Sequence, residues 1–262
     1  MNRITLIDKS NREWLVDQLR PDVITHVFAF YDLQYEQENT IMRAAVEDNR
    51  LKGYVLTYHA LDFPSVVLEC DGEDAAKLLK YVPEDKFIMH APQHLLPAIE
   101  SKFPASKHYV ENWMLVNKGK AEFFSSEHVR RLKEEDGSKL ASVLSSLKGR
   151  SKQSQKKYSD WIKKMPMYGV FVDDELVSYA GSFIQTREVW MIGGVYTLPD
   201  HRNKGYATLS TSAITREALE KSEAAALFVR SDNYSAIRAY EKIGFRKIGE
   251  KLWVDVGTGR KP

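Results

Sequence analysis

Cysteine is nearly absent from this chain of 262 residues, in which Cys70 is the only one. A single thiol excludes an internal disulfide and a zinc site built from several cysteines. The seven histidines show no ligand spacing either, because Pro92 stands between His90 and His94 and breaks a shared helical face. We therefore expect no bound metal and a reducing, cytoplasmic compartment.

Long hydrophobic runs are missing as well, since no apolar stretch approaches the ~18 residues of a membrane span. The N-terminus reaches Arg3 and Asp8 too early to form a signal peptide. An excess of one charge is also lacking: 38 basic residues balance 36 acidic ones, and the formal net charge is +2. Such a balance gives no strong field toward nucleic acid. We expect neither a membrane nor a nucleic acid as partner.

A loop rich in small residues stands between a predicted strand at 189–197 and a predicted helix at about 208–220. Its sequence from residue 199 is Pro-Asp-His-Arg-Asn-Lys-Gly-Tyr-Ala-Thr, which contains the pattern Arg-x-x-Gly-x-Ala. The first turn of a helix has free backbone N–H groups, and the helix dipole adds roughly half a positive charge there. These features favour phosphate, and Arg202 and Lys204 add positive charge beside them.

A second informative segment begins at Asn233, after a short apolar strand at 226–229. Tyr240 follows Asn233 by seven residues, which places both on one face of a helix, two turns apart. Gly244 and Phe245 come after that helix. The order of loop, strand, Asn, Tyr and Gly-Phe resembles the GNAT superfamily of acyl-CoA-dependent N-acetyltransferases, over roughly residues 128–254.

The resemblance implies a mixed α/β fold, acetyl-CoA as co-substrate and no metal. It also implies that the loop holds the pyrophosphate of coenzyme A, and that backbone N–H groups of the preceding strand face the thioester. Asn203 and Ala207 stand where glycine is common in the family, and both are small enough for the loop. The cofactor-binding residues implied in this way are Val195, Tyr196, Thr197, Arg202, Asn203, Lys204, Gly205, Tyr206, Ala207, Thr208 and Asn233.

Tyr240 is the residue expected to protonate the thiolate, because a phenol with a pKa of about 10 can serve as acid toward a thiolate of pKa about 8.5. A core tyrosine is the alternative. Asn233 can cap its helix as well as touch the cofactor. Gly193 and Gly194 can form a bulge that opens the strand before the loop, or they merely relieve packing.

The general base is the least certain part of the site. Phe228 stands on the strand where many GNAT proteins carry a glutamate. Glu188 is the first candidate, although its odd separation from Thr197 faces it away unless a bulge intervenes. An exposed Glu188 paired with Arg187 or water is the alternative, and a bound water chain can replace a side-chain base.

The same order of elements recurs in the N-terminal half, shifted by roughly 125 residues. We therefore predict two GNAT-like folds in tandem, an arrangement similar to glycine N-acyltransferase-like proteins. The predicted ranges are 1–118 for the first copy, 119–127 for a polar linker and 128–262 for the catalytic copy. In place of the phosphate loop the first copy has Asp71, Glu73 and Asp74, which repel a pyrophosphate. The first copy is expected to be divergent and not to bind the donor.

The sequence thus predicts an N-acetyltransferase that moves an acetyl group from acetyl-CoA to a primary amine by direct attack in a ternary complex. The acceptor is a small molecule or a protein, and the chain is expected to be a monomer or a homodimer. A non-catalytic acyl-CoA-binding or scaffold protein is the alternative, since Phe228 cannot take a proton. Seven basic residues between Lys148 and Lys164 either favour an acidic acceptor or form a solvated helix face.

Overall fold

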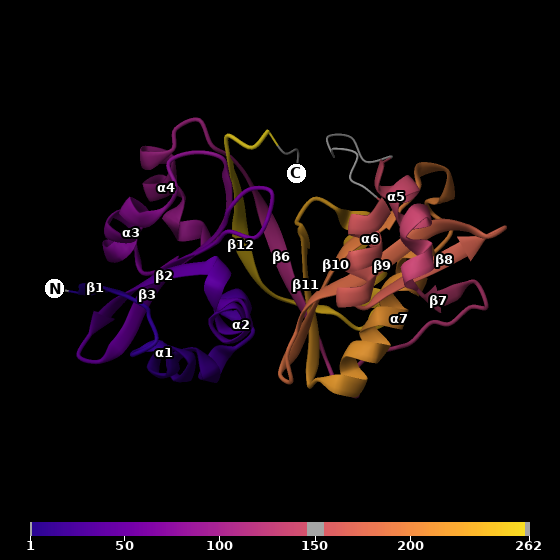
Figure 1. Cartoon of the computed structure of the whole chain (residues 1–262), viewed down its shortest axis with the longest axis horizontal. Coiled ribbons are helices and arrows are strands. Elements are labelled where there is room, and N and C mark those ends of the chain that lie inside the picture. The colour runs from indigo at the N-terminus through magenta and orange to yellow at the C-terminus, as the bar shows by residue number, and fades with distance from the viewer. Residues whose placement is uncertain (1, 146–154, 260–262) are drawn as a thin grey trace. The chain divides into compact units, whose positions relative to one another are not determined.

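Two compact units make up the structure, a computed structural model that describes residues 2–145 and 155–259 (Figure 1). By their contacts, the first unit contains Met1–Asn112 together with Gly249–Pro262, and the second contains Trp113–Ile248. None of the described helices is long and apolar enough to cross a membrane. The predicted ranges 1–118 and 128–262 follow the sequence repeat, whereas the units follow contacts and so divide the chain differently.

The first unit is a mixed sheet with helices packed on it. Its elements are β1 Arg3–Leu6, α1 Arg12–Leu19, η1 Arg20–Asp22, α2 Val27–Tyr35, η2 Gln37–Asn39, β2 Thr40–Glu47, β3 Arg50–Tyr58, β4 Ser65–Cys70, α3 Gly72–Leu78, η3 Leu79–Tyr81, β5 Phe87–Ala91, η4 Gln93–Leu95, α4 Leu96–Lys102, the first half of β6 Lys107–Asn117, and most of β12 Arg246–Val256. The strand order is β1-β2-β3-β4-β5-β12, with β6 next. From β1 to β12 the neighbours are antiparallel, except that β4 and β5 are parallel.

The second unit is also a mixed sheet. Its elements are the second half of β6, β7 Val129–Arg131, η5 Glu134–Asp136, α5 Gly137–Ser145, α6 Gln155–Lys164, β8 Met167–Val172, β9 Glu175–Gln185, β10 Val189–Thr197, η6 Pro199–His201, α7 Tyr206–Lys221, β11 Ala224–Arg230 and α8 Tyr234–Ile243. The strand order is β6-β11-β10-β9-β8-β7. In this order β10 and β11 are parallel, and β9 is antiparallel to both β10 and β8. The predicted mixed α/β fold class is confirmed.

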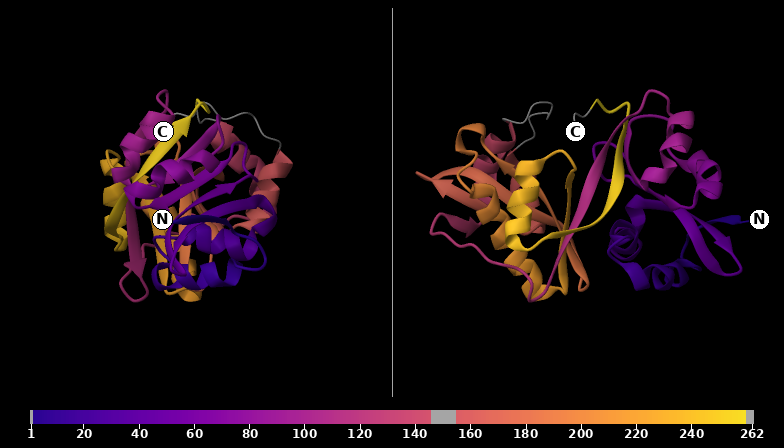
Figure 2. Two further views of the ribbon diagram at one scale, coloured as in Figure 1. Left: turned by 90° about the vertical axis from the view of Figure 1, so that its left-hand side faces the viewer. Right: turned by 180° about the vertical axis from the view of Figure 1, so that it is seen from behind.

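Apolar layers cover both faces of the second sheet. On one face, α7 and α8 bury Ile214 and Tyr240 in a core that includes Trp190 of β10. On the other face, α5 and α6 bury Leu140 and Tyr158 against residues of β8 and β9. In Figure 1, α5 and α6 lie in front of the strands, and in Figure 2, seen from behind, α8 lies in front of them. The pair α5 and α6 and the pair α7 and α8 therefore lie on opposite faces of the sheet.

The closing strands are exchanged between the two halves of the chain. β6 ends the first half of the sequence, yet Met114 and Val116 pack with Leu227 in the core of the second unit. β12 ends the chain, yet residues 252–256 pair with β5 in the first unit. Each unit is thus completed by a strand from the other half of the chain.

Candidate active site

β10 and β11 separate part-way along their length. Their parallel pairing covers three residues on each strand, from Val189 opposite Ala224 to Met191 opposite Ala226. β10 then continues to Thr197 and β11 to Arg230 without further registered pairs between them. Backbone N–H and C=O groups need hydrogen-bond partners, so this edge of β10 can hydrogen-bond a ligand that lies between the two strands.

β10 also bulges on its other side, toward β9. Gly193 pairs with Gly181 and Tyr196 with Tyr179, so β10 has one residue more than β9 over this stretch. Gly194 has φ +66, a left-handed conformation that favours glycine. The predicted bulge is confirmed, and it bends β10 where the strand leaves β11.

Gly193 has a separate reason to be glycine. A Cβ at this position would lie 2.7 Å from the ring of Phe183 on β9. Packing against Phe183 therefore explains the glycine at position 193, whereas the left-handed backbone explains the glycine at position 194. Beyond the bulge, Val195 packs in the layer of α7 and α8, whereas Tyr196 packs in the layer of α5 and α6.

The predicted phosphate loop connects β10 to α7 and contains two left-handed residues. Asn203 has φ 62 and Gly205 has φ 81. Asparagine is one of the few residues besides glycine that adopt this conformation readily, which explains why Asn203 can stand where glycine is common in the family. A Cβ added to Gly205 would meet nothing within 4 Å, so the space in front of the loop is open.

The first turn of α7 presents backbone N–H groups to that space. Gly205 is the N-cap, and no side chain among the described residues caps this helix. Leu209 donates its N–H to the Gly205 carbonyl at 3.1 Å, so the N–H groups of Tyr206, Ala207 and Thr208 precede the first bond of the helix. Donors of this kind at a helix N-terminus bind phosphate groups.

Two exposed cations flank the same loop. Arg202 donates from Nε to the Thr197 carbonyl at 3.3 Å, and its guanidinium lies 5.8 Å from the centre of the Tyr196 ring. Lys204 is exposed in the middle of the loop. Both charges can reach a phosphate held by the helix N-terminus.

A chain of hydroxyls joins the strand to the helix behind this loop. Ser178 of β9 lies 2.8 Å from the Thr197 hydroxyl and 3.3 Å from the Ser210 hydroxyl. Ser210 in turn donates to the Tyr206 carbonyl at 3.2 Å. Ser178 and Ser210 are both 0 % exposed, so these bonds fix the end of β10 relative to the first turn of α7. Nothing in the sequence pattern distinguishes these two serines from other small polar residues.

Tyr240 lies on the α7 and α8 side of the sheet. The residue is 6 % exposed, and its ring centre is 6.2 Å from that of Phe245 in an edge-on contact. Burial raises the pKa of Tyr240 well above its usual value. The phenol therefore stays protonated at neutral pH and is a hydrogen-bond donor, although it is a weaker acid than an exposed tyrosine.

Asn233 acts as the N-cap of α8. Its side-chain oxygen accepts from the Ala236 N–H at 3.3 Å and from the Ser235 hydroxyl at 3.1 Å. The capping alternative is confirmed. Because the cap uses the oxygen, the exposed amide nitrogen remains the group that would contact a cofactor.

Known proteins share this fold. Residues 167–254 match the family model described as FR47-like protein. A Drosophila protein is similar with a TM-score of 0.76 and 14 % identity, covering 99 % of this chain and 100 % of that one. A GCN5-related N-acetyltransferase from Kribbella flavida is similar with a TM-score of 0.62 and 15 % identity over 87 % of this chain and 94 % of that one.

A tandem GNAT protein from the clavulanic acid biosynthesis pathway is similar with a TM-score of 0.61 and 10 % identity. The match covers 99 % of this chain and 100 % of that protein. The chain has a tandem GNAT fold. No curated protein matches the sequence, so the roles of individual residues rest on the geometry of this chain.

Glu188 is not brought to the opening between β10 and β11. It lies in the turn before β10, while the opening begins after Met191 and the loop follows Thr197. At about 3.3 Å per residue, roughly 25 Å of strand separates Glu188 from Tyr196. Glu188 is expected to face away from Thr197 unless a bulge lies between them, and the structure does have that bulge. The role of Glu188 as general base stays a prediction.

Phe228 belongs to an aromatic cluster instead of a proton relay. Its ring stacks on Trp113 of β6 at 5.9 Å and meets Phe183 of β9 edge-on at 6.2 Å. Phe183 also fills the space that a side chain at Gly193 would need. The cluster therefore packs against the bulge with apolar rings.

An apolar pocket of about 110 Å³ opens beside the bulge and is lined by Gly193 and Gly194. It lies on the α5 and α6 side of the sheet, because Leu140, Leu144 and Tyr179 of that layer also line it. Of the basic segment, Lys148, Arg150 and Lys152 fall outside the described residues, and Lys156, Lys163 and Lys164 are exposed on α6.

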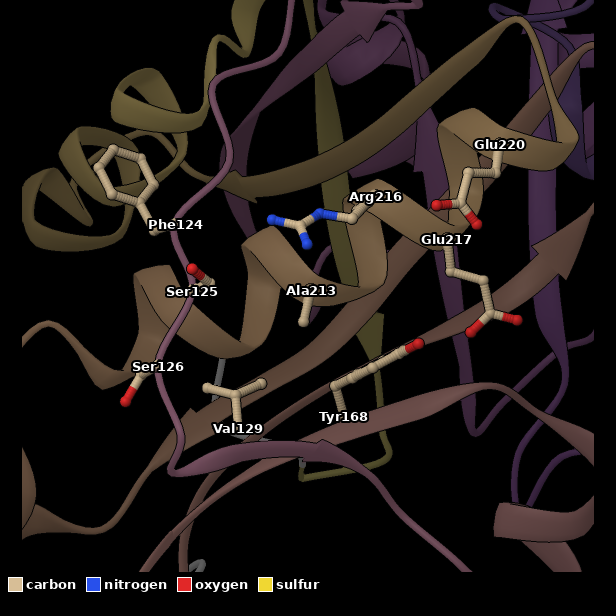
Figure 3. Close-up of a pocket in the computed structure, with 9 residues that line it drawn as sticks. All are labelled: Phe124, Ser125, Ser126, Val129, Tyr168, Ala213, Arg216, Glu217 and Glu220. Carbon is tan, nitrogen blue, oxygen red and sulfur yellow. The ribbon is translucent and has the colours of Figure 1, made fainter.

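A second pocket, of about 180 Å³, lies along the C-terminal half of α7, away from the loop (Figure 3). In Figure 3 the Tyr168 hydroxyl points toward Glu217. Glu217 is 6 % exposed and pairs with Arg131 at 3.2 Å and Lys221 at 2.6 Å. Burial and the Glu217 charge raise the pKa of Tyr168. None of the predicted site residues lines this pocket.

The corresponding part of the first unit carries buried ion pairs. Lys251 of β12 pairs with Glu69 of β4 and donates to the Thr25 carbonyl at 2.9 Å. Glu69 and Lys251 are 9 % and 8 % exposed. Asp74, in the first turn of α3, pairs with Lys77 at 2.9 Å. The first turn of this short helix thus carries an acidic side chain, Asp74, that forms an ion pair with a lysine.

Proposed function

We propose that this GNAT protein is an acetyltransferase that moves the acetyl group of acetyl-CoA to a primary amine. The observation that carries the proposal is the opening between β10 and β11, which begins after Met191 and leads to the uncapped first turn of α7. The loop would bind the pyrophosphate through the N–H groups of residues 206–208, with Arg202 and Lys204 beside it. The pantetheine would then lie along Val195, Tyr196 and Thr197.

The chemistry requires three events. A neutral amine attacks the thioester carbonyl carbon and forms the new C–N bond. Free N–H groups of β10 donate to the oxyanion that develops, a contribution of about 2.7–4 kcal/mol per donor in enzymes where it has been measured. The C–S bond then breaks, the thiolate leaves with its electron pair, and the amine nitrogen loses its extra proton to water.

Tyr240 would act at the leaving sulfur. Its buried phenol keeps its proton, so it can donate a hydrogen bond to the thiolate as the C–S bond breaks. Full proton transfer from a phenol of raised pKa is uphill, and the hydrogen bond itself lowers the cost of the negative charge. Asn233 would contact the cofactor through its amide nitrogen.

A non-catalytic acyl-CoA-binding role is the second candidate. The observation that favours it is the packing of Phe228, which puts an aromatic ring where many GNAT proteins carry a glutamate. Both candidates require donor binding, but only the enzyme releases coenzyme A.

The test is release of free thiol from acetyl-CoA in the presence of a panel of amines, amino acids and peptides. An enzyme gives amine-dependent thiol release together with the acetylated amine by mass spectrometry. Tight acetyl-CoA binding with no release for any amine would support the binding role instead.

A further inference from the structure

The pocket beside the bulge has a lining that matches apolar groups. Trp161 and Met165 of α6 join Leu140 and Leu144 of α5 on one side. Phe183 and the two bulge glycines line it on the strand side. No aspartate, glutamate, lysine, arginine or histidine is among the described residues that line it. Tyr179 and Ser182 carry the hydroxyls of this lining, and the other side chains are apolar. A ligand group that enters this pocket loses water and gains mostly apolar contacts, which favours hydrocarbon.

The Ser182 hydroxyl in this lining is already committed to the protein. Its oxygen lies 3.0 Å from both the Ile184 and the Met191 carbonyl, which share its one proton. A ligand hydroxyl or charged group would therefore compete with internal hydrogen bonds. Apart from the Tyr179 phenol, the lining therefore favours apolar groups over polar ones.

The volume limits the size of the guest. An apolar cavity of about 150 Å³ is large enough for benzene. The pocket here measures about 110 Å³. By that comparison it holds about four carbon atoms, such as an isobutyl group.

The face of the sheet on which the pocket lies indicates whether the apolar group in it belongs to the donor or to the acceptor. Tyr240 and α7 lie on one side of the sheet, and the pocket lies on the α5 and α6 side. The donor would enter along the loop at the N-terminus of α7. A group on the opposite side, beside the bulge, is placed to approach the thioester as the nucleophile.

From this geometry, and resting on the proposed function above, we infer that the acceptor is a primary amine carrying a compact apolar group of about four carbons. The pocket binds that group and holds the amine beside the bulge of β10. An acidic acceptor, one of the two alternatives for the basic segment, does not match this lining, because the described lysines of α6 are not part of it.

The first experiment compares amines that differ only in the apolar group. With acetyl-CoA as donor, we expect kcat/KM for isobutylamine to exceed that for methylamine by about tenfold or more, since one methylene in an apolar pocket is worth about 10-fold or more. Met165→Ala enlarges the pocket and should move the optimum to a longer amine, whereas Met165→Trp should remove the advantage of isobutylamine. Ile162→Val, on the same helix but outside the lining, is the control and should keep the order of amines.

The donor chain is the competing source of an apolar group. If Met165→Ala instead improves butyryl-CoA over acetyl-CoA and leaves the order of amines unchanged, the pocket serves the acyl chain and the inference is wrong. Equal kcat/KM for methylamine and isobutylamine in the unmodified protein would overturn it as well.

A second experiment needs no turnover. In protein labelled at the methionine methyl groups, isobutylamine should shift the carbon-13 resonances of Met165 and Met167, which line the pocket, while methylamine at equal concentration should not. Met42 and Met89 in the first unit serve as internal controls. Absence of the shift would refute the pocket assignment even if acetyl-CoA binds, and a shift without acetyl-CoA binding would refute only the proposed function.

Discussion

Left-handed residues decide where the backbone of this protein can face a ligand. Gly194, Asn203 and Gly205 have φ angles of 66, 62 and 81 and lie along the bulge of β10 and the loop that follows it. For ordinary residues this conformation costs roughly 1–2 kcal/mol. At these three positions the site thus depends on the backbone conformation and not on contacts made by the side chains.

Gly194→Val tests this dependence at the bulge. Valine is strained at positive φ, and its methyl groups would extend beyond a Cβ that is already in van der Waals contact with the Tyr179 ring, at 3.4 Å. We expect the bulge to straighten and kcat/KM to fall by about 100-fold, the loss typical of a misplacement of about 1 Å. Gly249→Ala, where an added Cβ meets nothing within 4 Å, is the matched control. Full activity of Gly194→Val would show that the bulge is not needed.

Tyr240→Phe tests the leaving-group role. We expect kcat to fall by about 100-fold or more, as for the loss of other hydrogen-bond donors to a developing anion, with the dissociation constant of acetyl-CoA little changed, because the hydroxyl acts only as the sulfur leaves. Steady-state kinetics and calorimetry measure the two quantities separately. Unchanged turnover in a variant with an unchanged melting temperature would leave Tyr240 as a core residue.

Among the elements, α5 is held in place by a carboxylate just before it. Asp136 accepts two hydrogen bonds of 2.7 Å from the Arg130 guanidinium and one of 2.8 Å from the Lys133 N–H. These bonds lower the pKa of Asp136, the Arg130 bonds most. The helix that lines the apolar pocket is therefore anchored by a paired charge.

Asp136→Asn should lower the free energy of unfolding by about 1–2 kcal/mol at pH 7, a value reduced for the exposed Arg130 side of the pair. Because the folded pKa lies below the unfolded one of about 3.9, the stabilisation is complete above about pH 4 and is lost as pH falls through the folded pKa. Urea unfolding from pH 7 to pH 3 should show the two proteins converging at low pH. A difference that stays constant to pH 3 would exclude the ionised pair as its cause.

Local elements were largely predictable, and long-range pairing was not. The loop, the bulge glycines and the Asn233 cap depend on residue types at fixed spacing, so the sequence shows them directly. The hydroxyl chain through Ser178 and Ser210 joins a strand to a helix 32 residues away, and no local pattern marks it. The placement of β12 beside β5 joins parts of the chain more than 150 residues apart, so the repeat alone predicted two separate copies.

For the whole molecule, the exchanged strands make each half of the chain depend on the other. Removal of residues 1–118 would remove β6 together with the first copy, and Met114 and Val116 belong to the core of the second unit. Loss of activity in that truncation would therefore not separate a role of the first copy in the reaction from damage to the core of the second unit.

Truncation at the other end tests the exchange directly. Ending the chain after Ile248 removes residues 249–262, including Leu252 and Val254, which are 1 % and 0 % exposed in the first unit. We expect the truncated protein to aggregate or to melt at a clearly lower temperature, as seen by size exclusion and circular dichroism. A chain that ends after Thr258 is the control and should melt as the full chain does. Equal stability of both would contradict the placement of β12.

We expect acetyl-CoA to bind this chain at one site, at the N-terminus of α7. Calorimetric titration of the full chain with acetyl-CoA measures it most directly. We expect one site per chain, and we expect Gly205→Glu to abolish binding, because a carboxylate at this left-handed position would occupy the open space before the loop and repel phosphate. Two sites per chain, no binding, or binding that survives Gly205→Glu would contradict the claim.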